Sequence, residues 1–578
     1  MNKVLPLFIA LFLATGATLA QTNMLSTNSI AEQILLGNYN PASYKASTVI
    51  NHPTALSTGI NNDVSPDSLK SLLLELNQLG NRNTGSDTLS SSKGIGAART
   101  WVHNRFQQYG QRNEQRLIAS YLQFDAGICN INRHKNIFAV LPGMDTSDKS
   151  IIIIEGHIDS RCEGVCDTAC IALGMEDNAT GTALVMELAR VMSKYSFNHT
   201  IVFLVTIGEE QGLYGAKAFA DYCTQKGIPI KAVLNNDVVG GIICGQTASP
   251  PGCMGAGTID STNVRLFSSG LFNSPHKGLA RYMKLEYKEM IQPITPVPMS
   301  INILTPEDRT GRGGDHIPFR QNGFTAIRLC AANEHGDANV TSSSYDDRQH
   351  TSTDILGLDT DNDLVIDSFF VNFNYLARNA IINGNAAAML AICPRTPKFN
   401  ISPPFGSTNI GIYITTEQQY GVYRVGVRTT THDWDSVYIF TGTYATIPLP
   451  SKSNYIVSVA SVDGNGVESL FSEEQYASVN VAYHKEQQPI VELLQNHPNP
   501  FDGETVISVA ANTDIKYQSA YISILDLNGK EVKRLNISLN KGVNEAVYNH
   551  GYLTTGMYLY TLVIDGEKID TKRMIFAN

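Results

Sequence analysis

The sequence predicts an α/β domain with a doubly wound, mostly parallel sheet, followed by two all-β sandwich domains. Between residues 67 and 394, apolar runs typical of buried strands alternate with segments whose apolar residues follow a helical period. From 395 to 485, and again from 491 to 578, short stretches alternate apolar and polar residues between turn-forming residues. A chain of 578 residues is long enough for several such domains.

The N-terminal segment has the features of a secretory signal peptide, which we assign to residues 1–20. Lys3 precedes an apolar run from Leu5 to Leu13, and the segment ends in small residues. This run is too short to span a bilayer, and no later run reaches about 18 apolar residues. We therefore expect an exported chain without a membrane span. Residues 21–66 show little periodicity, and we expect an extended leader or propeptide-like arm there.

Charge and cysteine content limit the classes of partner and compartment. The chain has 53 acidic and 43 basic residues, and the basic residues form no cluster, which argues against a nucleic-acid partner. Nine cysteines suit an oxidising compartment. Cys162, Cys166 and Cys170 recur at four-residue spacing, which fits either disulfides that pin a long loop or a zinc knuckle, and export favours disulfides. The odd total leaves at least one thiol unpaired or bonded to another chain.

The strands and helices of the α/β domain can be assigned in order. Strands are expected at 136–143, 150–160, 200–207, 232–237 and 324–330, and helices at 68–80, 94–110, 181–192, 215–226 and 367–391. The second strand is a continuous apolar run, which is typical of a parallel strand covered on both faces.

Metal-binding residue types follow three of these strands. His157 and Asp159 end one apolar run, Glu209 and Glu210 follow the next strand, and Asp237 ends a third. Because ligands of open α/β sheets gather at the carboxyl ends of the strands, we expect these side chains to lie close together.

Two further residues complete the donor set. Asp177 lies in a turn of small residues, DNATG, that opens a helix. It suits a bridging carboxylate, and the alternative is a plain helix N-cap. His350 in RQHTSTD supplies a second imidazole, with His316 in GGDHIPF as its competitor. Two histidines and three carboxylates, with a spare glutamate, are what a two-zinc hydrolytic site requires.

The pair Glu209-Glu210 predicts two different roles, a metal ligand and a base. Adjacent glutamates at a buried strand end repel each other unless a cation is present. Successive side chains of an extended backbone point to opposite sides, so one can bind metal while the other faces the substrate as a base. Asp159 lies two residues beyond His157, where it can accept the proton of the other ring nitrogen.

Six motifs carry a resemblance to a known family. GHIDS, EDNATG, GEEQGLYGA, NNDVVG, GGDHIPF and QHTSTD, in this order, resemble the co-catalytic zinc exopeptidases that include bacterial leucyl aminopeptidases and glutamate carboxypeptidase II. The resemblance covers residues 67–393. It implies two zinc ions, Glu209 as general base, Asp177 as the bridge, and His157, Asp177, Glu210, Asp237 and His350 as metal ligands. Glu176 stands where the family more often has Asp, and a cysteine-bearing insertion separates His157 from Asp177.

The resemblance implies a secreted zinc aminopeptidase that acts on peptides with a free N-terminus. The alternatives are a related zinc carboxypeptidase or deacylase, a glutaminyl cyclase of the same fold, and a non-catalytic surface adhesin. GHIDS and GGDHIPF favour the aminopeptidase over the carboxypeptidase group. Glutaminyl cyclases work with one zinc, so the complete ligand set argues against them, and an intact Glu209 argues against the adhesin.

The C-terminal third carries two further resemblances. Residues 395–485 resemble a fibronectin type III module in pattern and length. Residues 491–578 contain PNPF, DLNGKEV and GMYLYTL, and resemble the C-terminal sorting domain of cargo of the type IX secretion system. This implies passage through the periplasm, the secretion machinery as partner, and a secreted or cell-surface location.

An acidic turn, Asp359 to Asp363, resembles the start of a calcium loop. It lacks the glycine and the final glutamate of such loops, so we expect a solvated turn.

Overall fold

The computed structural model describes residues 21–245, 253, 255–308, 313–333, 348–402, 409–430, 433–449, 454–478, 491–526, 530–549 and 555–577. The predicted signal peptide, 1–20, lies outside the described residues. The chain divides into two compact units. The first comprises Met1–Arg265, Ile294–Ile301 and Arg309–Ala391, and the second Leu266–Pro293, Asn302–Asp308 and Ile392–Asn578.

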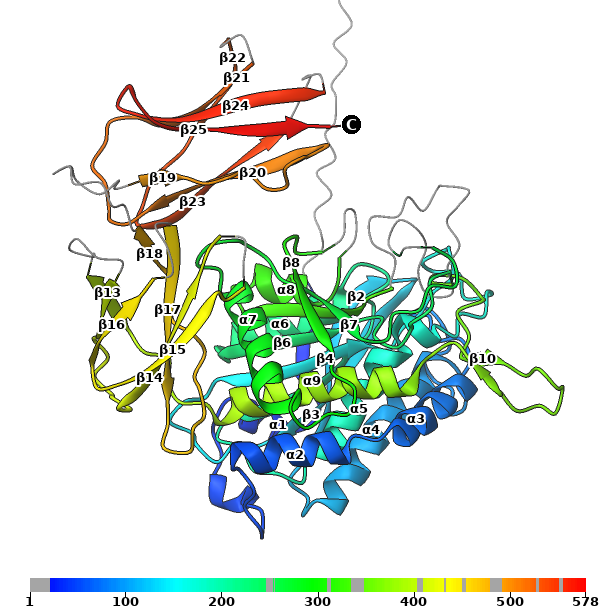
Figure 1. Ribbon diagram of the computed structural model, residues 1–578. Helices are drawn as coiled ribbons and strands as arrows, with labels where there is room; N and C mark the ends of the chain where they lie inside the picture. Colours follow the sequence, from blue (N-terminus) through cyan, green and yellow to red (C-terminus); the bar gives the residue numbers. More distant parts are fainter. Residues whose placement is uncertain are drawn as a thin grey trace, which may run out of the picture. The chain divides into compact units, whose positions relative to one another are not determined.

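The elements up to residue 392 are shown in Figure 1. In chain order they are β1 (Thr22–Ser26), α1 (Ser29–Leu35), η1 (Pro41–Tyr44), α2 (Pro53–Asp63), α3 (Pro66–Gln78), α4 (Gly94–Arg112), β2 (Ile118–Ile128), β3 (Ile131–Leu141), β4 (Ile151–His157), η2 (Met175–Ala179), α5 (Thr180–Met192), β5 (Thr200–Thr206), α6 (Tyr214–Lys226), β6 (Ile230–Asn236), β7 (Asn263–Phe267), α7 (Pro275–Glu286), η3 (Tyr287–Ile291), β8 (Ser300–Leu304), α8 (His316–Gln321), β9 (Ala326–Ala331), β10 (Gly357–Leu358), β11 (Ser368–Phe369) and α9 (Phe373–Ile392).

A nine-stranded mixed sheet forms the centre of this part of the chain, with strand order β1-β2-β3-β5-β4-β6-β9-β7-β8. Strands β5, β4, β6 and β9 run parallel, whereas β1, β2, β3 and β5 pair antiparallel. The predicted α/β class is confirmed. Every residue of β4 and β5 is buried, because parallel strands covered on both faces need apolar side chains on both faces.

The path of the chain reverses at β4, and this reversal positions the site. From β4 the chain crosses through α5 to β5 on one side, and from β5 it crosses through α6 to β6 on the other side of β4. Because such crossovers are right-handed, α5 and α6 cover opposite faces of the sheet. The carboxyl end of β4 is therefore a topological switch point, where open α/β sheets leave a crevice for ligands.

The segment 21–66 differs from the arm that the sequence predicts. Strand β1 pairs with β2 at the edge of the sheet, and α2 carries buried residues that include Leu56 and Ile60. Ser57 of α2 donates a hydrogen bond of 2.7 Å to Asn385 of α9, and Figure 1 shows the two helices side by side. The apolar residues of α2 stand among Thr, Ser and Asn, which hides their helical period in the sequence.

We expect Ile60→Ala to lower the free energy of unfolding by about 2–5 kcal/mol, because its buried side chain fills space beside Leu188 of α5 and Gly384 of α9. Thermal or denaturant unfolding of the first unit measures this. Asn62→Ala, at an exposed position of the same helix, is the control and should change stability little. Equal stability of both variants and the wild type would mean that this segment does not support the fold.

The C-terminal part of the second unit contains two β-sandwiches, each with its own apolar core. The first consists of sheets β12-β13-β16 and β15-β14-β17-β18, and the second of sheets β19-β20-β23 and β22-β21-β24-β25. Their strands are β12 (Phe399–Ser402), β13 (Asn409–Ile414), β14 (Val422–Arg428), β15 (Ser436–Thr441), β16 (Tyr444–Pro448), β17 (Asn454–Val462), β18 (Gln475–Ser478), β19 (Val491–Leu493), β20 (Glu504–Ala511), β21 (Ala520–Leu525), β22 (Glu531–Asn536), β23 (Gly542–Asn549), β24 (Gly556–Ile564) and β25 (Glu567–Phe576). The fibronectin type III likeness of the first sandwich stays a prediction.

Disulfides account for the cysteine spacing in the insertion. The pairs are Cys129–Cys166, Cys162–Cys170 and Cys244–Cys253. The first ties the insertion to the turn between β2 and β3, and the second closes a short loop inside the insertion. Cys223, Cys330 and Cys393 are buried thiols. Within the described residues, no helix combines the length and the apolar character that a membrane crossing requires.

Candidate metal centre

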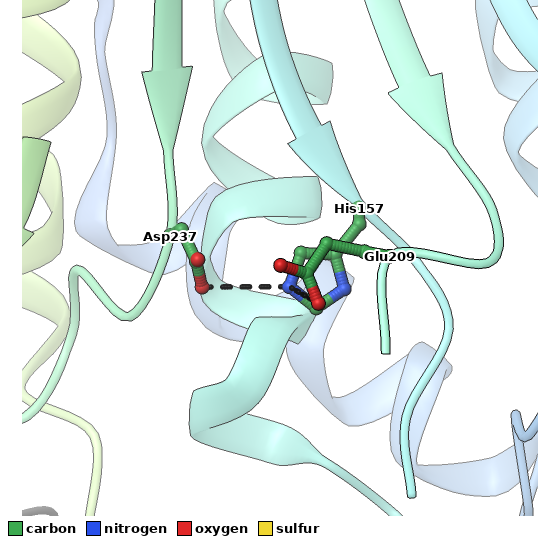
Figure 2. A group of neighbouring side chains, drawn as sticks. All are labelled: His157, Glu209 and Asp237. Atoms are coloured by element: carbon green, nitrogen blue, oxygen red, sulfur yellow. Dashed lines mark ion pairs between the residues drawn. The ribbon is translucent and has the colours of Figure 1, made fainter. Parts of the chain in front are cut away.

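Polar side chains from the ends of three strands lie at the switch point, the carboxyl end of β4. His157 is the last residue of β4, Glu209 and Glu210 lie three and four residues beyond β5, and Asp237 directly follows β6. Figure 2 shows the side chains of His157, Glu209 and Asp237 gathered at these strand ends, with dashed lines for the ion pairs of the His157 ring. Because β5, β4 and β6 are parallel neighbours, their carboxyl ends meet at one edge of the sheet, as the sequence predicts.

One group of donors surrounds His157. Its Nε2 lies 3.4 Å from Asp237 Oδ1, 3.4 Å from Asp177 Oδ1 and 3.9 Å from Glu209 Oε2. Ligand atoms of His157, Glu209 and Asp237 all lie within 4.8 Å of one another, which is compact enough to surround one ion.

A second group surrounds His350. Its Nε2 lies 3.0 Å from Asp177 Oδ2 and 3.3 Å from Glu210 Oε2. One ligand atom from each of these three residues again lies within 4.8 Å of the others. Asp177 therefore offers one carboxylate oxygen to each histidine. This is the arrangement of a carboxylate that bridges two ions.

The donor atoms fit zinc. His157 Nε2, Asp237 Oδ1 and Glu210 Oε1 are buried and have no hydrogen-bond partner in the part of the chain that the structure describes, which is costly unless a cation takes their lone pairs. Imidazole nitrogen and carboxylate oxygen are ligands that Zn²⁺ binds in catalytic sites. The structure thus brings together all five residues predicted as metal ligands, and their role as ligands stays a prediction.

The electrostatics of Glu209 differ from those of an ordinary glutamate. Burial raises the pKa of its carboxyl well above the usual range, and the nearby carboxylates of Asp237 and Glu210 add to the effect against an opposing contribution from His157. A carboxyl with a raised pKa is a stronger base, which suits a group that accepts and returns a proton. Glu209 lies farther from His157 than either Asp177 or Asp237 does.

Asp159 holds both the first histidine and the glutamate pair in position. His157 Nδ1 lies 3.1 Å from the Asp159 backbone carbonyl and 3.6 Å from its carboxylate, so the carbonyl, rather than the expected carboxylate, is the nearer acceptor for the ring proton. The carboxylate instead accepts hydrogen bonds from the backbone N–H groups of Glu209 and Glu210, at 3.3 and 3.2 Å. Thr84 donates a third, at 3.2 Å.

Two acidic residues that the sequence did not identify as structural supports hold the other turns. The Asp354 carboxylate accepts from the backbone N–H groups of Glu176 and Asp177, at 2.9 and 3.0 Å. Glu176 accepts from those of Gly240 and Gly241, at 3.0 and 2.5 Å. Asp354 ends the QHTSTD motif, four residues after His350, and holds the turn that carries Asp177.

Arg82 holds the two ends of the insertion together and was not found from the sequence. Its guanidinium is buried and donates to the backbone carbonyls of Ile158, Leu173 and Gly174. No motif surrounds Arg82 in the sequence, so nothing there indicated its position.

Two further features that the sequence analysis considered are His316 and the acidic turn from Asp359 to Asp363. His316 begins α8, is buried, and belongs to neither donor group found among the described residues. Carboxylate oxygens of Asp359, Asp361 and Asp367 lie within 4.8 Å of one another. Asp359 accepts hydrogen bonds from backbone N–H groups of its own turn. That this turn is solvated and binds no calcium stays a prediction.

Comparison with known proteins identifies the family. Residues 136–243 match peptidase family M28. A protein of Leptosphaeria maculans described as a probable zinc metalloprotease is 30% identical over 425 residues, which cover 70% of this chain and 94% of that protein. The chain belongs to peptidase family M28. Membership of this zinc peptidase family implies that zinc is the metal of the centre.

Further likenesses concern the C-terminus and the fold. Residues 496–576 match the secretion system C-terminal sorting domain, so the M28 chain carries a type IX signal for export to the cell surface or the medium. The LapA aminopeptidase of Legionella pneumophila is 18% identical, with a TM-score of 0.42 over 60% of this chain and 77% of that one. The glutaminyl cyclase of Porphyromonas gingivalis is 14% identical, with a TM-score of 0.37 over 56% and 97%.

We expect Asp159→Asn in the M28 domain to lower kcat or zinc affinity about 10- to 100-fold, because the amide replaces one of the oxygens that accept the Glu209 and Glu210 N–H groups. Steady-state kinetics and zinc content measure this. Thr84→Val removes a single hydrogen bond to the same carboxylate and should cost less. Wild-type kinetics and metal content in Asp159→Asn would show that Asp159 does not support the centre.

Proposed function

We propose that this M28 chain is a secreted aminopeptidase that removes N-terminal residues from peptides and uses two zinc ions. The observation that carries the proposal is the position of Asp177, whose two oxygens face His157 and His350. His157 and Asp237 would hold one ion and Glu210 and His350 the other, with Asp177 shared. Zinc bound there would supply Lewis acidity toward the peptide carbonyl and lower the pKa of the attacking water.

Glu209 is the proposed general base. It accepts the proton of the attacking water and passes it to the leaving amine. Its backbone is held by the Asp159 carboxylate, so the base keeps its place while its side chain changes charge. Asp159 therefore acts as a positioning residue for both Glu209 and His157.

The resemblance of GHIDS and GGDHIPF to aminopeptidases supports an exopeptidase that binds a free N-terminal amine. A leucine p-nitroanilide should be cleaved, while its N-acetylated form and peptides with a blocked N-terminus should not. Release of residues from the C-terminus instead would favour the carboxypeptidase alternative. Cyclisation of N-terminal glutamine with a single zinc per chain would favour a glutaminyl cyclase.

Glu209→Gln should keep both zinc ions and lose hydrolysis by about 10²- to 10⁴-fold, because it removes the proton carrier and no ligand. Glu210→Gln is the matched control, since it changes the neighbouring carboxylate and should lower zinc content. Metal analysis beside steady-state kinetics measures both. Loss of zinc from Glu209→Gln with retention in Glu210→Gln would reverse the two roles.

The sorting domain should be dispensable for catalysis. Deleting residues 491–578 removes the second sandwich, whose apolar core is separate from that of the first. We expect unchanged kcat/KM on a small substrate and retention of the truncated chain in the periplasm of a type IX secreting host, measured by cell fractionation. Normal secretion of the truncated chain would refute the proposed role of this domain.

A further inference from the structure

Helix α7 is shared between the peptidase sheet and the first sandwich. Along the chain it connects β7 with β8, which are neighbouring strands of the nine-stranded sheet. The compact unit to which α7 belongs, however, is the second one, which also contains the first sandwich. A connection between two strands of one domain that packs on another domain links the stabilities of the two.

A buried network of charged groups joins α7 to the sandwich. The Glu474 carboxylate, directly before β18, accepts hydrogen bonds from Arg281 of α7 at 2.6 Å and from Arg428 of β14 at 2.7 and 2.9 Å. It also accepts from the backbone N–H of Asn273 at 2.6 Å, and the Asn273 side chain accepts from the Glu474 N–H at 2.6 Å. The three charged side chains expose 5% of their surface or less.

Glu474 is the acceptor that this network shares. Burial raises the pKa of its carboxyl, but the guanidinium groups of Arg281 and Arg428 outweigh burial and lower the pKa below the usual value. Without Glu474, two buried guanidinium groups would lose their counter-charge, which costs far more than the loss of an exposed ion pair.

The network uses the outer face of the sandwich. Tyr423, Val425 and Val427 of β14 belong to the sandwich core. Because successive side chains of a strand point to opposite faces, Gly426 and Arg428 lie on the outer face. The outer face of a free-standing sandwich is solvated, whereas Gly426 and Arg428 are buried.

Aromatic side chains complete the contact. The Trp434 ring lies 5.3 Å from the Arg281 guanidinium. It also covers the backbone of Gly426, where an added Cβ would come within 2.2 Å of the ring. Tyr282 of α7 is fully buried and donates to the backbone carbonyl of Glu468 at 3.1 Å. The outer face of this sheet is therefore shaped for α7.

We propose that the first sandwich is a structural part of the peptidase rather than an attached module, with α7 as its docking surface. The nine-stranded sheet and the sandwich unfold as one cooperative unit, because α7 loses its packing when the sandwich unfolds. Lys277 of α7 donates to the carbonyls of Leu304 and Thr305, which precede the GGDHIPF motif in the chain, so the same loss frees the segment that leads into this motif. The inference does not rest on the proposed function, since its test measures unfolding.

The two tryptophans of the chain report on the two parts separately. Trp101 lies in α4 of the first unit, and Trp434 lies in the first sandwich. Full-length protein labelled with fluorotryptophan gives one fluorine NMR signal for each, and Trp101→Phe assigns them. In a urea titration, both native signals should disappear at the same midpoint. Loss of one native signal while the other remains would overturn the inference.

One destabilising variant on each side excludes an accidental agreement of the midpoints. Glu474→Ala opens the charged network and should lower the midpoints of both signals by about 1 M urea. Ile60→Ala, in α2 of the first unit, should also lower both. A shift confined to the tryptophan on the mutated side, in either variant, would show that the sandwich is an independent module.

A double-mutant cycle tests whether the network is the joint. Arg281→Ala and Glu474→Ala together should cost less than the sum of the single variants, because both remove the same contact. Additive losses in the Trp101 signal would overturn the assignment of this surface. Arg534→Ala removes an exposed ion pair with Glu531 in the second sandwich and is the control, which should change neither midpoint.

Discussion

The concentration of negative charge at the carboxyl ends of β4, β5 and β6 is the constraint on which the rest of the site depends. Asp177, Glu209, Glu210 and Asp237 are buried or nearly so, and among the described residues Glu210 Oε1 and Asp237 Oδ1 lack a hydrogen-bond donor. Buried carboxylates this close repel one another unless cations neutralise them. The fold can hold them only if the turns that carry them are fixed by other interactions.

Three buried carboxylates fix these turns in the same way. Asp159, Asp354 and Glu176 each accept hydrogen bonds from two successive backbone N–H groups. The turns so held carry Glu209 and Glu210, then Asp177, and then the segment that follows Asp237. Because the donors are backbone groups, each turn is held without using a ligand side chain, which leaves the ligand atoms available to an ion.

Much of this arrangement could be predicted from the sequence because its signals are local. The apolar runs of β4 and β5 and the polar residues just beyond them identify the sheet and its functional edge. The supports could not be predicted, because Arg82 and Asp354 reach backbone groups about 80 and 180 positions away along the chain, with no motif that pairs them. The structure of residues 21–66 was missed for a related reason. Helix α2 has few apolar residues, and its burial depends on α5 and α9.

The fold alone does not decide the chemistry, since one α/β scaffold hosts unrelated reactions. The proposed two-ion hydrolase rests on the presence of a histidine on each side of Asp177, with Glu209 as the proposed base beside them. A one-ion enzyme would need only one of these histidines beside the bridge. The two rings also have different partners, a backbone carbonyl for His157 and the guanidinium of Arg161 for His350. The insertion that carries Arg161 thus bears on the metal centre as well as on the surroundings of the substrate.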